Sequence, residues 1–238
     1  MRHGMRPLGV VLPVYNEGSV PADLVGRMPA IVDRVFVVDD GSTDDGPDLA
    51  ERAGAEVIRH GSRRGAGAAI RSGLFAARDR GMAAVVVMAG NGKDDPTEVP
   101  HVVAPLDEGY DYVQGSRFLR GGSFRNLPRS RHLLIKAYTV AFRLLTGFAA
   151  SDVTNGFRAY RVSLLSDPRI KLDQQWLDGY ELEYYLHYKA VTLPYRVLEV
   201  PVSKNYPSGK RDYSKMRPII DWWHGVRPVL FLALRIRD

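Results

Sequence analysis

The chain has 238 residues, 45% hydrophobic and 25% charged, a globular mixture that excludes extended disorder and suits one sizeable domain. It contains no cysteine, which excludes a disulfide scaffold, a thiolate nucleophile and a zinc–thiolate site and fits a cytoplasmic location. The net charge of +6 is unevenly distributed: residues 112–151 contain seven basic and no acidic side chains, and residues 204–238 contain eight basic and three acidic ones.

The first half of the chain alternates short apolar runs with segments of helical character. The runs are bounded by Gly, Asp and Pro and predict strands at 9–14, 34–38, 56–59, 83–88 and 110–114. Helices are predicted between them at 17–28, 44–53 and 66–80. This alternation predicts an α/β fold with a mostly parallel sheet covered by helices on both faces. Ligands of such sheets bind beyond the carboxyl ends of the strands, so we expect the functional residues there.

The second half has longer helical segments and fewer apolar runs, and we expect a mainly helical, basic C-terminal part. The predicted helices are 128–145 and 177–189, and the predicted strands are 155–160 and 196–200. Residues 214–237 have helical character that Pro218 and Pro228 interrupt. No repeat or low-complexity linker separates the two halves. A boundary near residue 118 therefore divides two parts of a single structural domain.

Two adjacent carboxylates follow the second predicted strand. Asp39 and Asp40 lie at the functional edge of the sheet, where at least one of them should accept hydrogen bonds from a ligand. The N–H of a nucleobase and the hydroxyls of a ribose are suitable donors. Ser42 and Asp44 follow directly, and a simpler interpretation is that they cap the next helix.

The sequence Gly65-Ala66-Gly67 opens the third predicted helix and matches only part of a dinucleotide-binding fingerprint. It follows the third strand instead of the first, and Ile70 stands where a third glycine is needed, which argues against an NAD site. Close approach of a phosphate to this helix N-terminus remains open, with Arg63 or Arg64 beside it.

An ordered set of motifs spans residues 8–216. The motifs are LPVYNE at 12–17, VDDGSTD at 38–44, RGAGAAI at 64–70, GSRF at 115–118, GG at 121–122, SDVTNGFRAYR at 151–161, EVPV at 199–202 and YSK at 213–215. In this order they resemble the family 2 glycosyltransferases of the GT-A fold, and specifically the dolichol- or polyprenyl-phosphate mannosyltransferase branch. The resemblance implies an inverting transfer of a sugar from a nucleotide-sugar to an acceptor such as a polyprenyl phosphate. It also implies three parts: a nucleotide-sugar-binding part (1–118), an acceptor-binding part (119–203) and a basic amphipathic loop and helix (204–238).

The resemblance also assigns roles to individual residues. Base and ribose would be held by Pro13, Tyr15, Glu17 and Asp40, with Asp39 in support. The remaining donor-binding residues would be Arg64, Gly67, Gly90, Asn91 and Lys93. The acceptor phosphate or the pyrophosphate would meet Arg117, with Arg129 or Arg131 behind it. Finally, Ser214 and Lys215 would close a loop over the donor phosphates.

The chain departs from the family at the usual metal site. The family ends its fourth strand with Asp-x-Asp, which holds Mg²⁺ or Mn²⁺ on the donor phosphates, whereas this chain has Ala89 and Asn91 at those positions. Hard cations prefer charged oxygen ligands, so the site is severely weakened. Three alternatives remain open. Lys93 replaces the cation as a point charge, Asn91 with Asp94 or Asp95 holds a metal differently, or catalysis is lost.

Two glutamates, Glu181 and Glu183, lie where the family carries an acidic residue on a helix near the acceptor. A hydroxyl acceptor needs such a carboxylate as a base, whereas a lipid phosphate is already an anion at pH 7. A solvated helix face would explain the same two residues. The six histidines show no metal-binding spacing, and we expect them to be structural.

The C-terminal segment combines Trp222, Trp223 and aliphatic residues with basic ones. This mixture suits a peripheral contact with the inner face of an anionic membrane, and equally a core-packed helix with a basic solvent face. Its apolar run at 228–234 is far shorter than the roughly 20 residues that span a bilayer. The basic half lacks a recognition helix or an RNA-stacking motif, so nucleic acid is not an expected partner. Two functions compete with lipid glycosylation: transfer to a soluble small molecule, and binding of a nucleotide-sugar without turnover.

Overall fold

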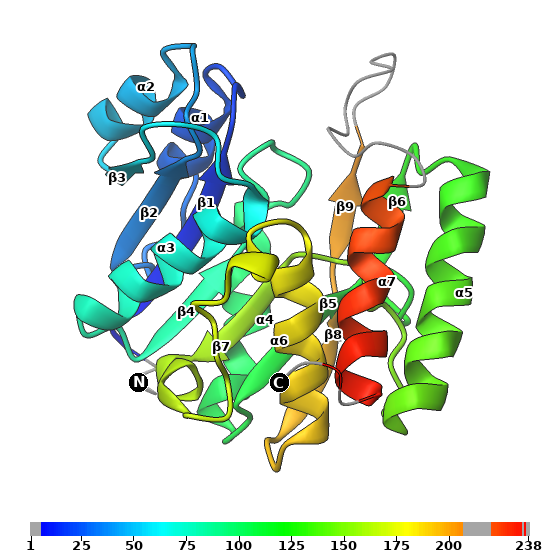
Figure 1. The fold of residues 1–238 in the computed structure, drawn as a ribbon. Coiled ribbons are helices and arrows are strands. Elements are labelled where there is room, and N and C mark those ends of the chain that lie inside the picture. The colour runs from blue at the N-terminus through cyan, green and yellow to red at the C-terminus, as the bar shows by residue number, and fades with distance from the viewer. Residues whose placement is uncertain (1–5, 207–219, 235, 237–238) are drawn as a thin grey trace.

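A computed structural model describes residues 6–206, 220–234 and 236 of the chain. Its centre is a seven-stranded sheet with the order β3-β2-β1-β4-β7-β5-β8 (Figure 1). The strands are β1 (Leu8–Val14), β2 (Arg34–Asp39), β3 (Glu56–Arg59), β4 (Ala84–Val87), β5 (Tyr112–Ser116), β7 (Arg158–Arg161) and β8 (Val197–Pro201). Strand β7 runs antiparallel to both of its neighbours, and the other pairs are parallel. The predicted α/β class with a mostly parallel sheet is therefore confirmed.

Helices cover both faces of this sheet. They are α1 (Val20–Gly26), α2 (Gly46–Arg52), α3 (Ala66–Asp79), α4 (Val99–Asp107), α5 (Arg129–Thr146), α6 (Glu181–Thr192) and α7 (Ile220–Ala233). On one face α3 and α6 share a core with Val11 of β1, and on the other α1, α2 and α4 share a second core with Val10. Because both faces are buried, the strands are continuous apolar runs instead of alternating ones.

One α-helix and two short strands are absent from the predicted elements. Helix α4 contains Pro100 and Pro105, which interrupt the helical pattern. The short strands β6 (Ser123–Arg125) and β9 (Ser203–Asn205) pair in a second, two-stranded sheet. Each has three residues, too few to give a periodic signal.

Several predicted helix boundaries were wrong. Helix α1 begins at Val20 instead of residue 17, because the preceding residues form a turn in which Asn16 and Gly18 have positive φ. Helix α6 begins at Glu181 instead of residue 177. Pro228 does not interrupt the C-terminal helix, which runs from Ile220 to Ala233 through it. The predicted part of this helix at 214–219 lies outside the described residues.

Helices α5, α6 and α7 form a third, smaller core at the side of the sheet. Tyr138, Phe142 and Val229 are buried in it. Figure 1 shows α5 and α7 side by side beyond α6. Val229 and Leu232 of α7 are buried, which favours the core-packed alternative for this helix, whereas Leu234 and Ile236 after it are 67% and 59% exposed. The side chains of Trp222 and Trp223 lie outside the described ones. Within the described residues, no helix combines the length and apolar character needed to cross a membrane.

Candidate active site

The candidate site lies where the parallel strands β1, β2 and β4 end, and Asp39 and Asp40 are buried there. Oδ1 of Asp40 accepts a hydrogen bond from the backbone N–H of Arg64 at 2.8 Å and lies 2.9 Å from Nδ1 of His60. Its Oδ2 accepts from the N–H of Gly65 at 2.8 Å. Three of the four acceptor positions of this carboxylate are therefore used within the protein. Asp40 anchors the loop before α3, a task different from the predicted contact with base and ribose.

Asp39 retains more capacity to accept a ligand hydrogen bond. Its Oδ1 accepts from the N–H of Ser42 at 2.8 Å, and no described residue donates to its Oδ2. The two carboxylates were predicted with Asp40 as the main contact and Asp39 in support, whereas the open acceptor positions favour Asp39. Asp39 is the stronger candidate to hold a base or ribose, and Asp40 supports it.

The loops after β1 and β2 are tied together by side-chain to backbone hydrogen bonds. Oγ of Ser42 accepts from the N–H of Asn16 at 3.0 Å, and Oδ1 of Asn16 accepts from the N–H of Thr43 at 2.8 Å. Asp44 bonds the N–H groups of both Gly18 and Gly46. The interpretation of Ser42 as a helix cap is therefore wrong. Asp44 contacts the first turn of α2 through Gly46, and it also links the two loops through Gly18.

Aromatic and glycine residues shape the same edge. The guanidinium of Arg63 lies 4.4 Å from the ring centroid of Tyr15, which joins the loop before α3 to the loop after β1. Gly90 lets the end of β4 approach the end of β1, since a Cβ there would come within 2.7 Å of the carbonyl oxygen of Pro13. Tyr15, Pro13 and Gly90, all predicted donor-binding residues, thus share one edge.

The N-terminus of α3 is covered by the protein's own chain. The N–H of Ala68 donates to the carbonyl of Asp178 at 3.0 Å, and a Cβ on Gly67 would lie 2.1 Å from the carbonyl oxygen of Leu177. As expected, another group approaches the backbone closely at this glycine, but that group is the turn before α6 and not a ligand. A phosphate directly on this helix N-terminus is therefore not supported.

Replacing Gly67 with alanine should destabilise the fold by about 1–3 kcal/mol, because the new methyl group overlaps backbone carbonyls that cannot move independently. Urea unfolding followed by circular dichroism measures this. Gly61→Ala is the matched control, since a Cβ there meets nothing within 4 Å. Equal unfolding midpoints for the two variants would contradict this account of Gly67.

The loop after β4 does not have the ligands of a divalent cation. Asp94 is buried, and its Oδ1 pairs with Nζ of Lys204 at 2.6 Å while its Oδ2 accepts from the N–H of Ala89 at 2.9 Å. Asp95 caps the following 3₁₀ helix (Pro96–Glu98) through the N–H of Thr97 and pairs with Arg27 at 3.1 Å. Within the described part of the chain, no group of three or more His, Asp or Glu side chains could hold a metal ion. The residues present do not fit the cation of the family, and Asn91 stands without the acidic partners that a metal needs.

Positive charge gathers where that cation would act. Burial first, and then the charges of Lys204 and Arg131, together lower the pKa of Lys93 to about 8, while Glu17 and Asp94 oppose the shift. Lys204 is held in place by Asp94 and by Oδ1 of Asn155 at 2.9 Å. The carbonyl of Lys93 accepts from the N–H of Asn205, so β9 carries Lys204 to this loop. Lys93, Lys204 and Arg131 form what we call the cation cluster.

The lowered pKa of Lys93 predicts a pH dependence of diphosphate binding. A bound diphosphate stabilises the ammonium, so the pKa in the complex lies above about 8, the value without ligand. Affinity for UDP or GDP should fall as the pH rises through about 8, by up to about tenfold per pH unit, until the higher pKa of the complex is reached. Calorimetric titration at several pH values measures this, and Lys93→Ala should abolish the slope. A slope that persists in the variant would assign it to another group.

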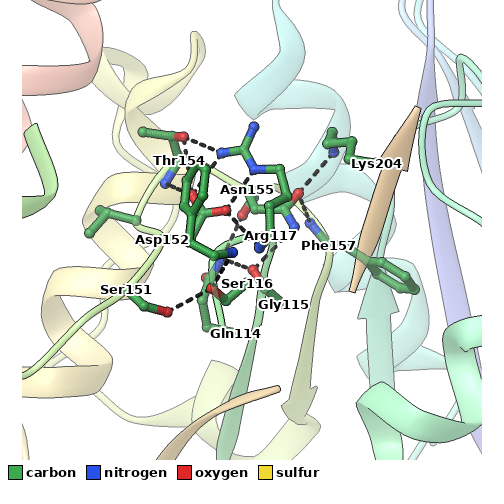
Figure 2. Close-up of polar contacts among 12 residues, drawn as sticks. Gln114, Gly115, Ser116, Arg117, Ser151, Asp152, Thr154, Asn155, Phe157 and Lys204 are labelled. Carbon is green, nitrogen blue, oxygen red and sulfur yellow. Dashed lines mark hydrogen bonds and ion pairs between the residues drawn. The ribbon is translucent and has the colours of Figure 1, made fainter. Parts of the chain in front are cut away.

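The predicted phosphate ligand Arg117 is buried and hydrogen-bonded within the protein. Its Nε donates to Oδ2 of Asp152 at 2.6 Å, and its Nη2 donates to Oδ1 of Asp152 at 2.7 Å and to Thr154 at 2.6 Å. The hydroxyl of Tyr206 accepts from Nη1. Figure 2 shows this guanidinium directed at Asp152 and Thr154, with Lys204 reaching Asn155 beside it. Most of its donors are used inside the protein, and its predicted contact with a phosphate stays a prediction.

The other predicted acceptor residues differ in their exposure. Arg131 is half-buried, with its guanidinium 5.6 Å from the ring centroid of Tyr206, whereas Arg129 at the start of α5 is exposed. Ser214 and Lys215 lie outside the described residues, so their roles stay predictions.

The two predicted bases differ as well. Glu181 is buried and pairs with Arg227 of α7, which makes it a link between α6 and α7 instead of a proton acceptor. Glu183 is half-buried, and its carboxyl faces Gly156, where a Cβ would come within 2.6 Å of Oε1. Only Glu183 of this pair keeps the character of a candidate base.

Sequence reasoning missed several residues that build the site. Asp152 and Asn155 stand in a motif that the sequence singled out, but nothing there gave them partners. His60, Lys204 and Tyr206 act through contacts made over 20 to 110 positions of sequence, for which a single sequence carries no signal.

Comparisons with known proteins give relatives along most of the chain. The model of glycosyl transferase family 2 matches residues 9–167. Polyprenol monophosphomannose synthase of Mycolicibacterium smegmatis is 34% identical over 82% of this chain and 76% of its own length. Undecaprenyl-phosphate mannosyltransferase of Micrococcus luteus is 32% identical over 81% of both chains.

Among solved structures, glucosyl-3-phosphoglycerate synthase of Mycobacterium tuberculosis, in complex with Mn²⁺, UDP and glucosyl-3-phosphoglycerate, has a TM-score of 0.68 at 23% identity. The match covers 97% of this chain and 81% of that one, and it shows a common fold. Together with the family match over two thirds of the sequence, these relatives establish that the chain belongs to glycosyl transferase family 2.

Proposed function

We propose that this chain transfers a hexose from a nucleotide-sugar to the phosphate of a membrane polyprenol, and that Lys93 balances the charge of the leaving diphosphate. The observation that carries this proposal is the cation cluster, which stands at the end of β4 in place of the acidic motif of the family. The two relatives that are 34% and 32% identical to this chain are named for transfer of mannose to polyprenyl phosphates.

The reaction needs little proton chemistry if the acceptor is a phosphate. An oxygen of the acceptor phosphate attacks C1 of the sugar from the side opposite the diphosphate, the C1–O bond to the diphosphate breaks, and the configuration at C1 is inverted. The acceptor is already an anion at neutral pH, so no base is required. What the site must supply is stabilisation of the negative charge that develops on the departing diphosphate.

The described residues suit that task. Lys93 is half-buried, which strengthens its interaction with an anion, and Lys204 keeps Asp94 from cancelling the positive charge. In this proposal Asp39, Tyr15 and Glu17 hold the nucleoside. The phosphate of the acceptor approaches from the side of Arg131, at the start of α5.

Transfer assays with purified protein test the proposal. GDP-, UDP- and dTDP-hexoses are each combined with a short polyprenyl phosphate, with excess EDTA or with Mg²⁺, and the lipid product is measured by mass spectrometry. We expect one donor class to give a polyprenyl-phosphate hexose at nearly equal rates under both conditions. Loss of activity in EDTA would contradict the role of Lys93. Nucleotide-sugar binding without turnover would support the non-catalytic alternative, and transfer only to soluble acceptors would contradict the lipid acceptor.

A polyprenyl phosphate resides in a membrane, so the proposal includes peripheral contact with a bilayer. The C-terminal segment was the predicted contact. In that segment Val229 and Leu232 are buried, Leu234 and Ile236 are exposed, and the side chains of residues 207–225 lie outside the described ones.

A further inference from the structure

Helix α5 carries an apolar stripe on its solvent side. Leu133, Val140 and Leu144 are 71%, 52% and 82% exposed, and Ala137 between them is exposed as well. The spacing of four, three and four residues places these side chains on one face of the helix. The buried side chains Ile135, Tyr138 and Phe142 occupy the opposite face, against α6 and α7. We call the exposed stripe of Leu133, Ala137, Val140 and Leu144 the outward face of α5.

Basic residues border the outward face on one side. Arg129, Lys136 and Arg143 recur every seven residues and are exposed. No acidic residue occurs between positions 112 and 151, so nothing on this helix offsets their charge. A surface that is apolar in the middle and basic at its margin is complementary to a bilayer with anionic headgroups, because the acyl region takes the leucines and the phosphates take the basic side chains.

Helix α5 also connects this surface to the candidate active site. Arg131, in its first turn, lies over Tyr206 and acts electrostatically on Lys93. In Figure 1 the helix forms the outer edge of the molecule on the side away from α1 and α2. A phosphate at a membrane surface would therefore meet the site at the start of the helix that rests on that membrane.

We infer that the outward face of α5 docks the protein onto the surface of an anionic bilayer and so brings the cation cluster to the phosphate of its lipid acceptor. The inference rests on the proposed function for the identity of the acceptor, whereas the docking itself follows from the surface alone. A second copy of the chain fits this face less well, because a symmetric contact would bring basic margins together with no acidic residue between them.

Sedimentation with vesicles tests the docking. Wild-type protein should bind vesicles of phosphatidylcholine with 30% phosphatidylglycerol, in a salt-sensitive manner, and bind pure phosphatidylcholine much more weakly. The double variant Leu133→Gln/Leu144→Gln should lose binding by at least about tenfold, since both side chains are largely exposed in the protein alone and gain burial only in the bilayer. Lys136→Gln should weaken binding by about fivefold.

Matched controls stand at the other end of the sheet. Ile31→Gln changes another exposed apolar residue, and Arg52→Gln removes an exposed charge from α2; neither should alter vesicle binding. Failure of the wild type to bind anionic vesicles, or equal losses in the controls, would overturn the inference. So would a concentration-dependent dimer that the double leucine variant abolishes, because that face would then be an interface between copies.

A second readout separates this inference from the proposed function. With a short polyprenyl phosphate dissolved without vesicles, the double leucine variant should retain wild-type turnover, and it should lose turnover when a long-chain acceptor is embedded in vesicles. Vesicle binding without transfer to any acceptor would refute the proposed function and leave the docking surface intact. Transfer to vesicle-embedded acceptor that is unchanged in the leucine variant would refute the docking surface and leave the function intact.

Discussion

Lys93→Ala should lower kcat/KM for sugar transfer by about two to three orders of magnitude, the cost of removing one preorganised charge at a leaving anion. The effect is large because burial has already removed part of the hydration of this ammonium, so its field acts on the diphosphate with little screening. Single-turnover rates with the natural donor class measure the chemical step. Addition of Mg²⁺ should not restore the activity, since Asp94 and Asp95 are engaged elsewhere.

Two further variants control this experiment. Lys93→Arg keeps the charge and should retain part of the rate, although its planar donors suit the site differently. Lys171→Ala removes an exposed lysine from the loop before α6 and should leave the rate unchanged. Full activity of Lys93→Ala in EDTA, or rescue of that variant by Mg²⁺, would show that lysine does not take the place of the cation.

The order of elements in the first half was predictable because each buried strand is a short apolar run that ends in Gly, Asp or Pro. Strand β3 at Glu56–Arg59 was predicted with its observed boundaries, and the place of Asp39 at the functional edge followed from the parallel topology. The loss of the metal-binding Asp-x-Asp motif of the family was also visible in the sequence, because Ala89 cannot ligate a cation.

Contacts between residues that lie far apart in the sequence could not be predicted. Asp94 resembled a spare metal ligand until Lys204 was found 110 positions away with its ammonium at 2.6 Å. Arg117 was assigned to a phosphate by the family resemblance, and a single sequence did not show that Asp152, 35 positions away, pairs with its guanidinium. The internal hydrogen bonds of Asp40 were hidden for a similar reason, since its backbone donors belong to a loop 24 and 25 residues further along. In each case a charged side chain predicted as a contact with a ligand or metal instead has an internal partner.

Arg117→Ala should destabilise the fold by about 3–5 kcal/mol, because it leaves the carboxylate of Asp152 buried without its counter-ion. Asp152→Asn should be destabilising for the reciprocal reason, as it leaves a buried guanidinium beside a neutral amide. The double variant Arg117→Met/Asp152→Leu should lose less than the sum of the single variants with these substitutions, since no isolated charge remains. Urea unfolding midpoints and slopes give the unfolding free energy of each of these variants.

Arg34→Ala is the control for the loss of an arginine from an ion pair. Its guanidinium lies 2.7 Å from Glu56 but is exposed, and Glu56 keeps a second partner in Arg80, so the cost should be about 1 kcal/mol or less. The comparison also decides between the two roles of Arg117. If Arg117 held the acceptor phosphate, Arg117→Ala would raise KM for the acceptor while its unfolding resembled that of Arg34→Ala. If Arg117 instead anchors the loops around Asp152 and Tyr206, Arg117→Ala should lower the unfolding free energy. The reason is that the guanidinium bonds both residues in the absence of substrate.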